Sequence, residues 1–93
     1  MTAEYEWDRG KAAANRRKHA VDFADAVGVF EDPFALTRSD SEYSEDRAVT
    51  LGRDYLERLV TVAWVWRAGR VRLISARLAT PRERRQYAEG GDA

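Results

Sequence analysis

The sequence predicts a single α+β domain: N-terminal helices, then a three- or four-stranded antiparallel sheet, then a C-terminal helix. Helix-favouring and charged residues dominate residues 8–30. From residue 47, segments rich in Val, Leu, Ile, Thr and Trp alternate with short breaks. These breaks suit hairpins and are too short for parallel crossovers. A capped helical segment follows residue 80.

The chain length suits one core in one domain, which we expect to span residues 1–93. The apolar fraction, 44%, is close to that of an average globular domain, whereas the charged fraction, 34%, is well above it. The surface should therefore be densely charged. The polar and acidic residues 40–46 are expected to form a mobile loop.

The first elements follow from local patterns. Residues 3–7 (AEYEW) alternate apolar and acidic side chains and predict a short strand. Asp8 is a good N-cap for the helical segment RGKAAANRRKH that follows it. The cations from Arg16 to His19 close this segment, where the helix dipole favours positive charge.

A second helix is predicted after Asp22, because apolar residues recur at spacings of three and four up to Phe30. Pro33 disfavours a helical conformation at Asp32 and should end this helix. Residues 34–38 (FALTR) have the character of a short strand.

Three strands and a helix complete the chain. The strands are RAVTLGR, RLVTVAWVW and RVRLISARL, separated by DYLE and RAG. Thr80 is the expected N-cap of the last helix, with Pro81 at its first position and Glu83 completing a capping box.

A net charge of zero conceals a segregation of charge. Residues 1–46 hold six Lys or Arg against eleven Asp or Glu, a net of −5, and residues 47–93 hold ten against five, a net of +5. All basic residues after Lys18 are arginines, whose forked guanidinium groups match phosphate and carboxylate. Two interpretations remain open: the halves attract each other in the fold, or the arginines line a phosphate-binding surface.

Several classes of protein are disfavoured. The chain has no cysteine and one histidine, which excludes disulfides and thiolate zinc sites and leaves no compact metal-ligand spacing. Its glycines fit no nucleotide-binding fingerprint, so we expect no metal and no cofactor. There is no run of about 18 apolar residues, and the N-terminus is acidic. We therefore expect a soluble, cytoplasmic protein without membrane contact.

The first predicted helix carries candidate ligand-binding residues. Lys11, Asn15 and His19 are spaced by four and share one face, and Lys18 extends this polar stripe. The stripe is either a solvated helix face that ends in a capping histidine or a surface for a ligand. Trp7, just before the helix, either packs beneath it or stacks on a base.

Arg77 is the arginine of greatest interest. On strict alternation it shares a row with Val71 and Leu73, opposite Arg72, so it needs a partner on the core side. That partner is either a ligand phosphate or a carboxylate. The carboxylates considered are those of Glu45, Asp46 and Glu83.

These residues fall in motifs that resemble one family. The segment WDRGKAAANRRKHAVDF, residues 7–23, is similar to the motif WDxxKxxxNxxKHxVxF of BrnT toxins. Three further motifs follow in the order seen in that family. They are AVGVFEDP, then an E-x-R pair (Glu45 and Arg47) before Gly52, and then VRLISARLATPRERRQY. The resemblance covers about residues 5–88.

The resemblance implies a ribonuclease toxin of a type II toxin–antitoxin system, with a fold similar to that of RelE-type ribonucleases. The toxin would cleave RNA without metal, inhibit translation and growth, and form a hetero-oligomer with a ribbon-helix-helix (BrnA-like) antitoxin. Operator DNA would be bound only through the antitoxin. One departure stands out: members of that family usually carry glycine where this chain has Ala20, and alanine would cost about 1 kcal/mol if that position is left-handed.

Given that resemblance, roles can be assigned to the candidate residues. His19 suits acid or base chemistry near neutral pH, and Tyr87 or Glu45 could carry a further proton. Lys11 and Arg77 suit a phosphate clamp, with Arg53 or Arg47 as a second contact. The alternative is a non-catalytic binding module, or co-repressor, that docks an acidic or DNA-binding partner. The remaining RNA-binding candidates are Arg72, Lys18, Asn15 and Trp7.

Overall fold

The computed structural model of the protein describes residues 4–40, 42 and 46–90. The elements, in order, are β1 (Glu4–Glu6), α1 (Arg9–His19), α2 (Phe23–Ala26), η1 (Val27–Glu31, a 3₁₀ helix), β2 (Leu36–Ser39), β3 (Arg47–Arg53), β4 (Leu59–Arg67), β5 (Arg70–Leu78) and α3 (Pro81–Ala88). The expected acidic loop falls largely outside the described residues, and so does Glu45.

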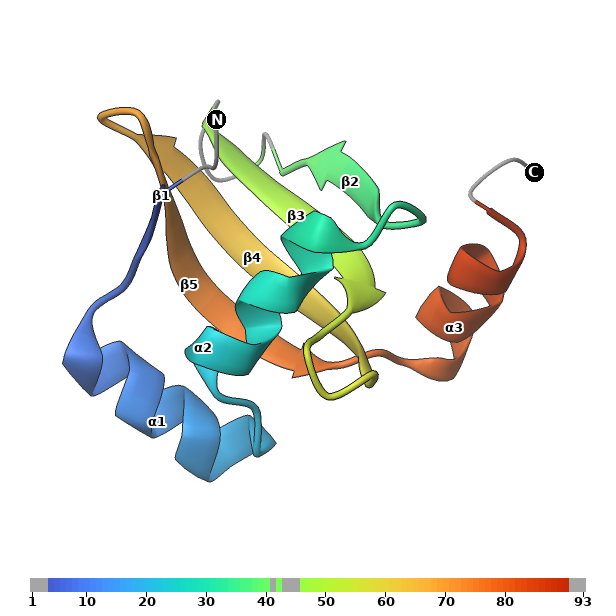
Figure 1. The fold of residues 1–93 in the computed structure, drawn as a ribbon, viewed down its shortest axis with the longest axis horizontal. Coiled ribbons are helices and arrows are strands. Elements are labelled where there is room, and N and C mark those ends of the chain that lie inside the picture. The colour runs from blue at the N-terminus through green and yellow to red at the C-terminus, as the bar shows by residue number, and fades with distance from the viewer. Residues whose placement is uncertain (1–3, 41, 43–45, 91–93) are drawn as a thin grey trace.

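The strands form one sheet in the order β1-β5-β4-β3-β2 (Figure 1). Strands β2 to β5 are antiparallel neighbours, as predicted, and the α+β class is confirmed. The sheet is larger than expected, with five strands, and it is mixed because β1 pairs with β5 in parallel. Residues 3–7 gave no signal of this partner, which lies more than 60 residues along the chain.

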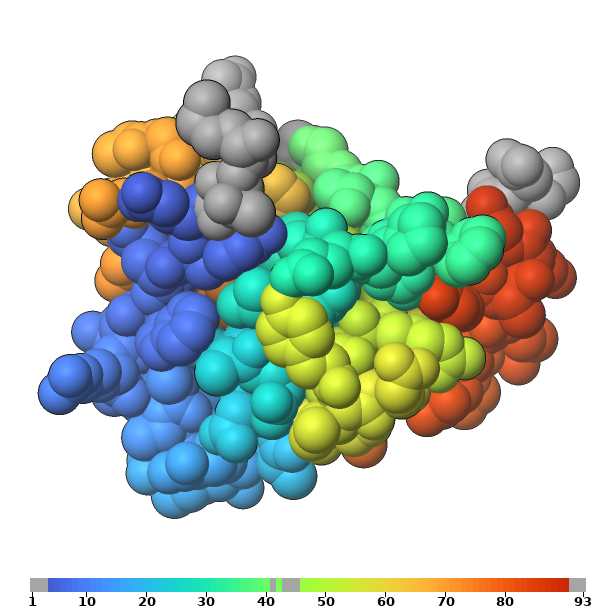
Figure 2. Space-filling model, in the orientation of Figure 1, coloured from blue at the N-terminus to red at the C-terminus, as the bar shows by residue number. Residues whose placement is uncertain are grey.

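The helices cover one face of this sheet, which we call the covered face. Figure 1 shows α2 and η1 in front of the strands with α1 beside them at the lower left, and Figure 2 shows the same side closed over by side chains. Val21, Phe23 and Val29 pack here against β4 and β5. The largest core cluster therefore lies between these helices and the sheet. Its strand members are Val60, Val62, Val71, Leu73 and Ala76.

On the opposite face, which we call the open face, α3 is the one described helix that packs, and Figure 1 shows it beside one end of the sheet. There Tyr87 and Leu36 pack on a small cluster formed by Leu51, Leu59 and Ala79. The capping box predicted for α3 is present, because Thr80 Oγ1 accepts from the Glu83 N–H. None of the described helices is long and apolar enough to cross a membrane.

The local signals of the first two helices are only partly confirmed. Asp8 caps α1 as predicted, because its Oδ2 accepts from the Lys11 N–H at 2.9 Å. The segment after Asp22 is a single turn of α-helix that continues as the 3₁₀ helix η1. Asp22 occupies the N-cap position, but its side chain accepts no capping hydrogen bond.

A β-bulge changes which face the end of β5 presents. Ile74 has no partner in the register between β4 and β5. Leu73 and Ala76 therefore both lie in the core, although residues three apart on a regular strand face opposite sides. Arg77 is directed to the open face as a result. The expectation that Arg77 shares a row with Val71 and Leu73 is wrong for this reason.

Candidate active site

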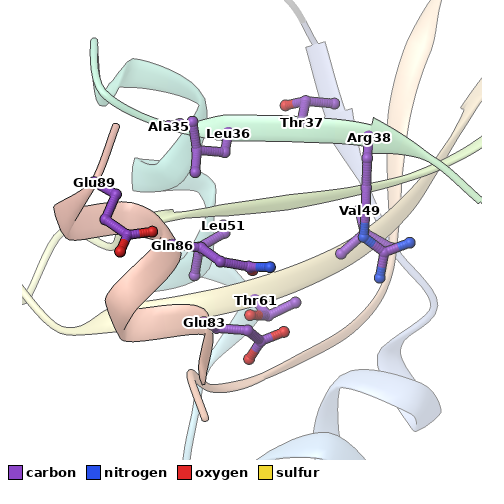
Figure 3. Close-up of a pocket in the computed structure, with 10 residues that line it drawn as sticks. All are labelled: Ala35, Leu36, Thr37, Arg38, Val49, Leu51, Thr61, Glu83, Gln86 and Glu89. Carbon is purple, nitrogen blue, oxygen red and sulfur yellow. The ribbon is translucent and has the colours of Figure 1, made fainter. Parts of the chain in front are cut away.

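The open face holds two adjoining hollows. The first, the α3 hollow, has a volume of about 460 Å³ and lies between α3 and strands β2 to β4 (Figure 3). The second, the arginine hollow, has a volume of about 380 Å³ and continues along the sheet away from α3. The two share Arg38, Val49 and Thr61 as lining residues, so they form one groove. The arginine hollow is lined further by Asp40, Glu42, Arg47, Ala63, Ser75 and Arg77.

The strand register explains why three arginines from distant parts of the sequence meet here. Arg38 on β2 pairs with Val49 on β3, and Arg47 lies two residues earlier on β3, so both side chains point to the open face. Arg77 on β5 pairs with Thr61 and joins the same face because of the bulge. The groove therefore gathers Arg38, Arg47 and Arg77 on a surface that α1 and α2 do not cover.

Arg77 forms a bidentate pair with Glu83, the first residue of α3 that faces the sheet. Its Nη1 and Nη2 donate to the two Glu83 carboxylate oxygens at 2.8 and 3.0 Å. One of the carboxylate partners considered from the sequence is thus the observed one. The Arg77 side chain remains 40% exposed, and a guanidinium has more N–H groups than this pair uses. Arg77 can therefore be held by Glu83 and still present donors to the groove.

Glu83 has a strongly perturbed pKa. Burial by itself would raise the pKa of this carboxyl group, but hydrogen bonds from Arg77 and the Thr80 N–H, together with the Arg77 charge, lower it to about 2. Glu83 is therefore ionised at neutral pH and is a poor proton donor or acceptor there. Its role in the groove is to orient Arg77.

The other two groove arginines, Arg47 and Arg38, differ in whether an ion pair holds the side chain. Arg47 forms an ion pair with Asp40, in which Nε and Oδ2 are 3.2 Å apart. Arg38 is exposed, and no described residue forms an ion pair or hydrogen bond with its side chain. The sequence reasoning did not select Arg38. Two features of the sequence could have indicated Arg38. Alternation within FALTR places Leu36 and Arg38 on one face of the strand, and Arg38 is a lone cation in an otherwise acidic segment.

Arg72 lies on the same face, on β5, next to the edge strand β1. It pairs with Val65 in the register and donates through Nη1 to Glu6 on β1 at 2.8 Å. That hydrogen bond and the charges of Arg72 and Arg70 lower the pKa of Glu6. Arg72 is not among the residues that line either hollow of the groove.

A second cluster brings together Arg53 and Tyr87, two predicted catalytic residues. The Arg53 guanidinium lies 5.5 Å from the centre of the Tyr87 ring, and the Tyr87 hydroxyl donates to Asp32 Oδ2 at 2.7 Å. Burial and this bond raise the pKa of Tyr87. Gly52 fits beside the cluster, because a Cβ there would lie 3.2 Å from the same Asp32 oxygen. The cluster lines a separate hollow of about 420 Å³ at the end of the sheet.

The remaining predicted residues belong to the covered side of the molecule. Lys11 and Lys18 are exposed on α1, and His19 is half-buried at its end. Asn15 is buried and joins α1 to β5: its amide donates to the Val21 and Ala76 carbonyls, and its Oδ1 accepts from the Ala76 N–H. The sheet therefore separates these residues from the arginine hollow.

Trp7 also lies on that side. Its ring packs edge-on against Phe23, with centroids 6.0 Å apart. The packing alternative, rather than base stacking, describes this contact. Among the described residues, no group of three His, Cys, Asp or Glu is placed to hold a metal ion.

Comparison with known proteins gives a family and a fold. Residues 7–83 match the family described as the ribonuclease toxin, BrnT, of type II toxin–antitoxin systems. Among solved structures, the chain is similar to the Brucella abortus ribonuclease toxin BrnT, with 24% identity and a TM-score of 0.68. That match covers 85% of this chain and 99% of the other. No curated protein matches the sequence. The family match extends over most of the chain, and the chain therefore belongs to the BrnT family of ribonuclease toxins of type II toxin–antitoxin systems.

Proposed function

We propose that this protein is an endoribonuclease that cleaves RNA in the open-face groove without a metal ion. The observation that carries the proposal is the convergence of Arg38, Arg47 and Arg77 on the sheet face that α1 and α2 leave uncovered. Several cations at one place suit the scissile phosphate, whose negative charge grows in the transition state.

The division of roles follows from the contacts. Arg38 is the mobile clamp, because no described partner restrains it, and Arg77 is the rigid clamp, because Glu83 fixes its plane. The 2′-oxygen attacks phosphorus while its proton passes to a base, and the bond between phosphorus and the 5′-oxygen breaks. The products are a 2′,3′-cyclic phosphate and a 5′-hydroxyl group, whose proton comes from solvent water. The carboxylates of Asp40 and Glu42 line the arginine hollow and are our candidates for the base.

The roles of the other candidates change accordingly. Lys11, Lys18 and His19 are placed across the sheet from the clamp, so we propose that they contact RNA outside the cleavage site or serve the fold. Arg53 and Tyr87 stay candidates for RNA contact at the end of the sheet. Asn15 and Trp7 serve packing, and Arg72 supports β1 through Glu6.

The test is cleavage of bulk RNA by purified protein in excess EDTA. Wild type should cleave, and Arg77→Ala should lower the rate on the order of 10²-fold, as expected when a transition-state donor is lost. Arg85→Ala is the matched control, because Arg85 is an exposed arginine of α3 outside the groove. Lys11→Ala should lower the rate less than about tenfold. A variant Arg77→Ala that is folded by circular dichroism and fully active would refute the assignment.

A non-catalytic binding module remains the second candidate. It is favoured by one observation: two of the three groove arginines already have acidic partners, Glu83 and Asp40, within the described chain. If wild-type protein leaves RNA intact both with EDTA and with added Mg²⁺, while it still binds a partner, this candidate replaces the nuclease.

We propose further that a ribbon-helix-helix, BrnA-like antitoxin neutralises the toxin in a hetero-oligomer, and that operator DNA is bound through the antitoxin. Membership of a type II family supports a protein antitoxin. An acidic antitoxin segment lying along the arginine hollow would block the phosphate site directly. We propose the cytoplasm as the site of action, because translation, which RNA cleavage would inhibit, takes place there.

A further inference from the structure

The α3 hollow differs chemically from the arginine hollow that it adjoins. Its floor is apolar, formed by Leu36, Val49 and Leu51 on β2 and β3. One wall is α3 with its C-cap residue, which contributes Glu83, Gln86 and, at the cap, Glu89. Residues three apart share a helix face, so these three side chains form one stripe along the hollow. Figure 3 shows Gln86 and Arg38 reaching into the space from opposite sides.

The charges of the two hollows favour different parts of a nucleotide. The arginine hollow carries Arg38, Arg47 and Arg77, which attract phosphate. The α3 wall carries two carboxylates, which repel phosphate, above a floor that suits the flat face of a base. A nucleotide bound across the shared residues would therefore place its phosphate by the arginines and its base against α3.

The polar groups of the α3 wall also select among bases. Glu83 is committed to Arg77 and the Thr80 N–H, which leaves Gln86 and Glu89 to contact a ligand. Among the described residues, neither of these two side chains has a hydrogen-bond partner. A carboxylate only accepts hydrogen bonds, and the Gln86 amide offers a carbonyl acceptor beside an N–H₂ donor, so the acceptor atoms outnumber the donor group on this wall. The wall thus favours a base that presents N–H donors.

We propose that the α3 hollow is a base-reading subsite, in which Gln86 and Glu89 select guanine over uracil on the RNA strand whose phosphate lies in the arginine hollow. Guanine presents imino and amino N–H donors side by side on its Watson–Crick edge, whereas uracil presents one N–H between two carbonyl oxygens. This inference rests on the proposed RNA-binding role of the groove, but not on cleavage.

The experiment is a titration of the isotope-labelled protein with GMP and with UMP, followed by NMR. GMP should shift the signals of residues in both hollows. It should also bind about five- to tenfold more tightly than UMP, which is the lower end of the discrimination expected from one bidentate contact between a side chain and a base. Glu89→Gln and Gln86→Ala should each reduce that ratio to nearly one. Arg38→Ala should weaken both nucleotides equally.

Glu4→Gln is the matched control for Glu89→Gln, because Glu4 is an exposed glutamate on β1 that lines neither hollow of the groove. It should leave the ratio unchanged. Equal affinities for GMP and UMP in wild type, shifts confined to residues outside the α3 hollow, or a ratio that survives both α3 variants would each overturn the subsite. Base-selective binding by a protein that does not cleave RNA would support the subsite while refuting the nuclease.

Discussion

Replacing Glu83 with glutamine removes one charge from the Arg77–Glu83 pair while it keeps the size of the side chain. Glutamine can also complete a capping box, so the start of α3 should survive. The pKa of Glu83 is lowered to about 2, and its side chain is only 17% exposed. A shift of that size corresponds to roughly 3 kcal/mol of folding free energy. Because Arg77 is 40% exposed, solvent screens the pair, and we expect about 1–2 kcal/mol.

The sign of the pH dependence follows from the direction of the shift. A carboxyl group whose pKa is lowered by folding stabilises the native state above its unfolded pKa, near 4.5, and loses this contribution as the pH falls toward about 2. The free-energy difference between wild type and Glu83→Gln should therefore be full at pH 7 and shrink progressively below about pH 4.5.

Urea unfolding at pH 7 and at pH 3 measures this difference through the midpoint, provided that the denaturant slope is unchanged. At pH 7 the melting temperature should also fall by roughly 4–16 °C, as expected for 1–2 kcal/mol in a domain of this size. Glu89→Gln, at the C-cap of the same helix and without a described side-chain partner, should change stability by less than about 0.5 kcal/mol. An equal loss at pH 7 and pH 3 would show that the ion pair is not what holds Arg77.

Three further outcomes are expected. Ala20 has φ 58°, ψ 30°, so Ala20→Gly should raise the free energy of unfolding by about 1 kcal/mol, measured by urea unfolding; a lower value would contradict left-handed strain. His19 lies across the sheet from the groove, so His19→Gln should keep the wild-type pH–rate profile of RNA cleavage. Loss of one limb of that profile in the variant would show that His19 takes part in catalysis. The antitoxin should slow hydrogen exchange in β3 to β5 and α3; protection confined to α1 would place its dock on the covered side.

Elements fixed by near neighbours in the chain were predictable from the sequence. The Asp8 cap and the Thr80–Glu83 capping box each satisfy backbone groups within three residues, so they form wherever that segment is placed. The β3–β4 and β4–β5 hairpins are close in sequence, and their breaks limit them to antiparallel pairing. The left-handed conformation at Ala20 was likewise raised by the sequence, as a position where the family has glycine.

Long-range pairing was decided by the tertiary structure alone. The parallel contact of β1 with β5 joins residues 4–6 to residues 70–72, and no local pattern encodes it. The same limit applies to Asn15, whose polar spacing suggested a ligand, but whose amide satisfies the backbone of Ala76 on a strand 61 residues away.

The groove shows this limit most clearly. The sequence determined that the second half of the chain is rich in arginine and that Arg77 needs a partner. It did not determine which arginines meet, because the face that a strand residue presents depends on every register step before it. One extra residue, Ile74, reverses the faces of β5 and places Arg77 beside Arg38 and Arg47, while the sheet separates it from Lys11 and His19. A bulge of this kind depends on how two strands pack against each other, and alternation within either strand alone cannot reveal it.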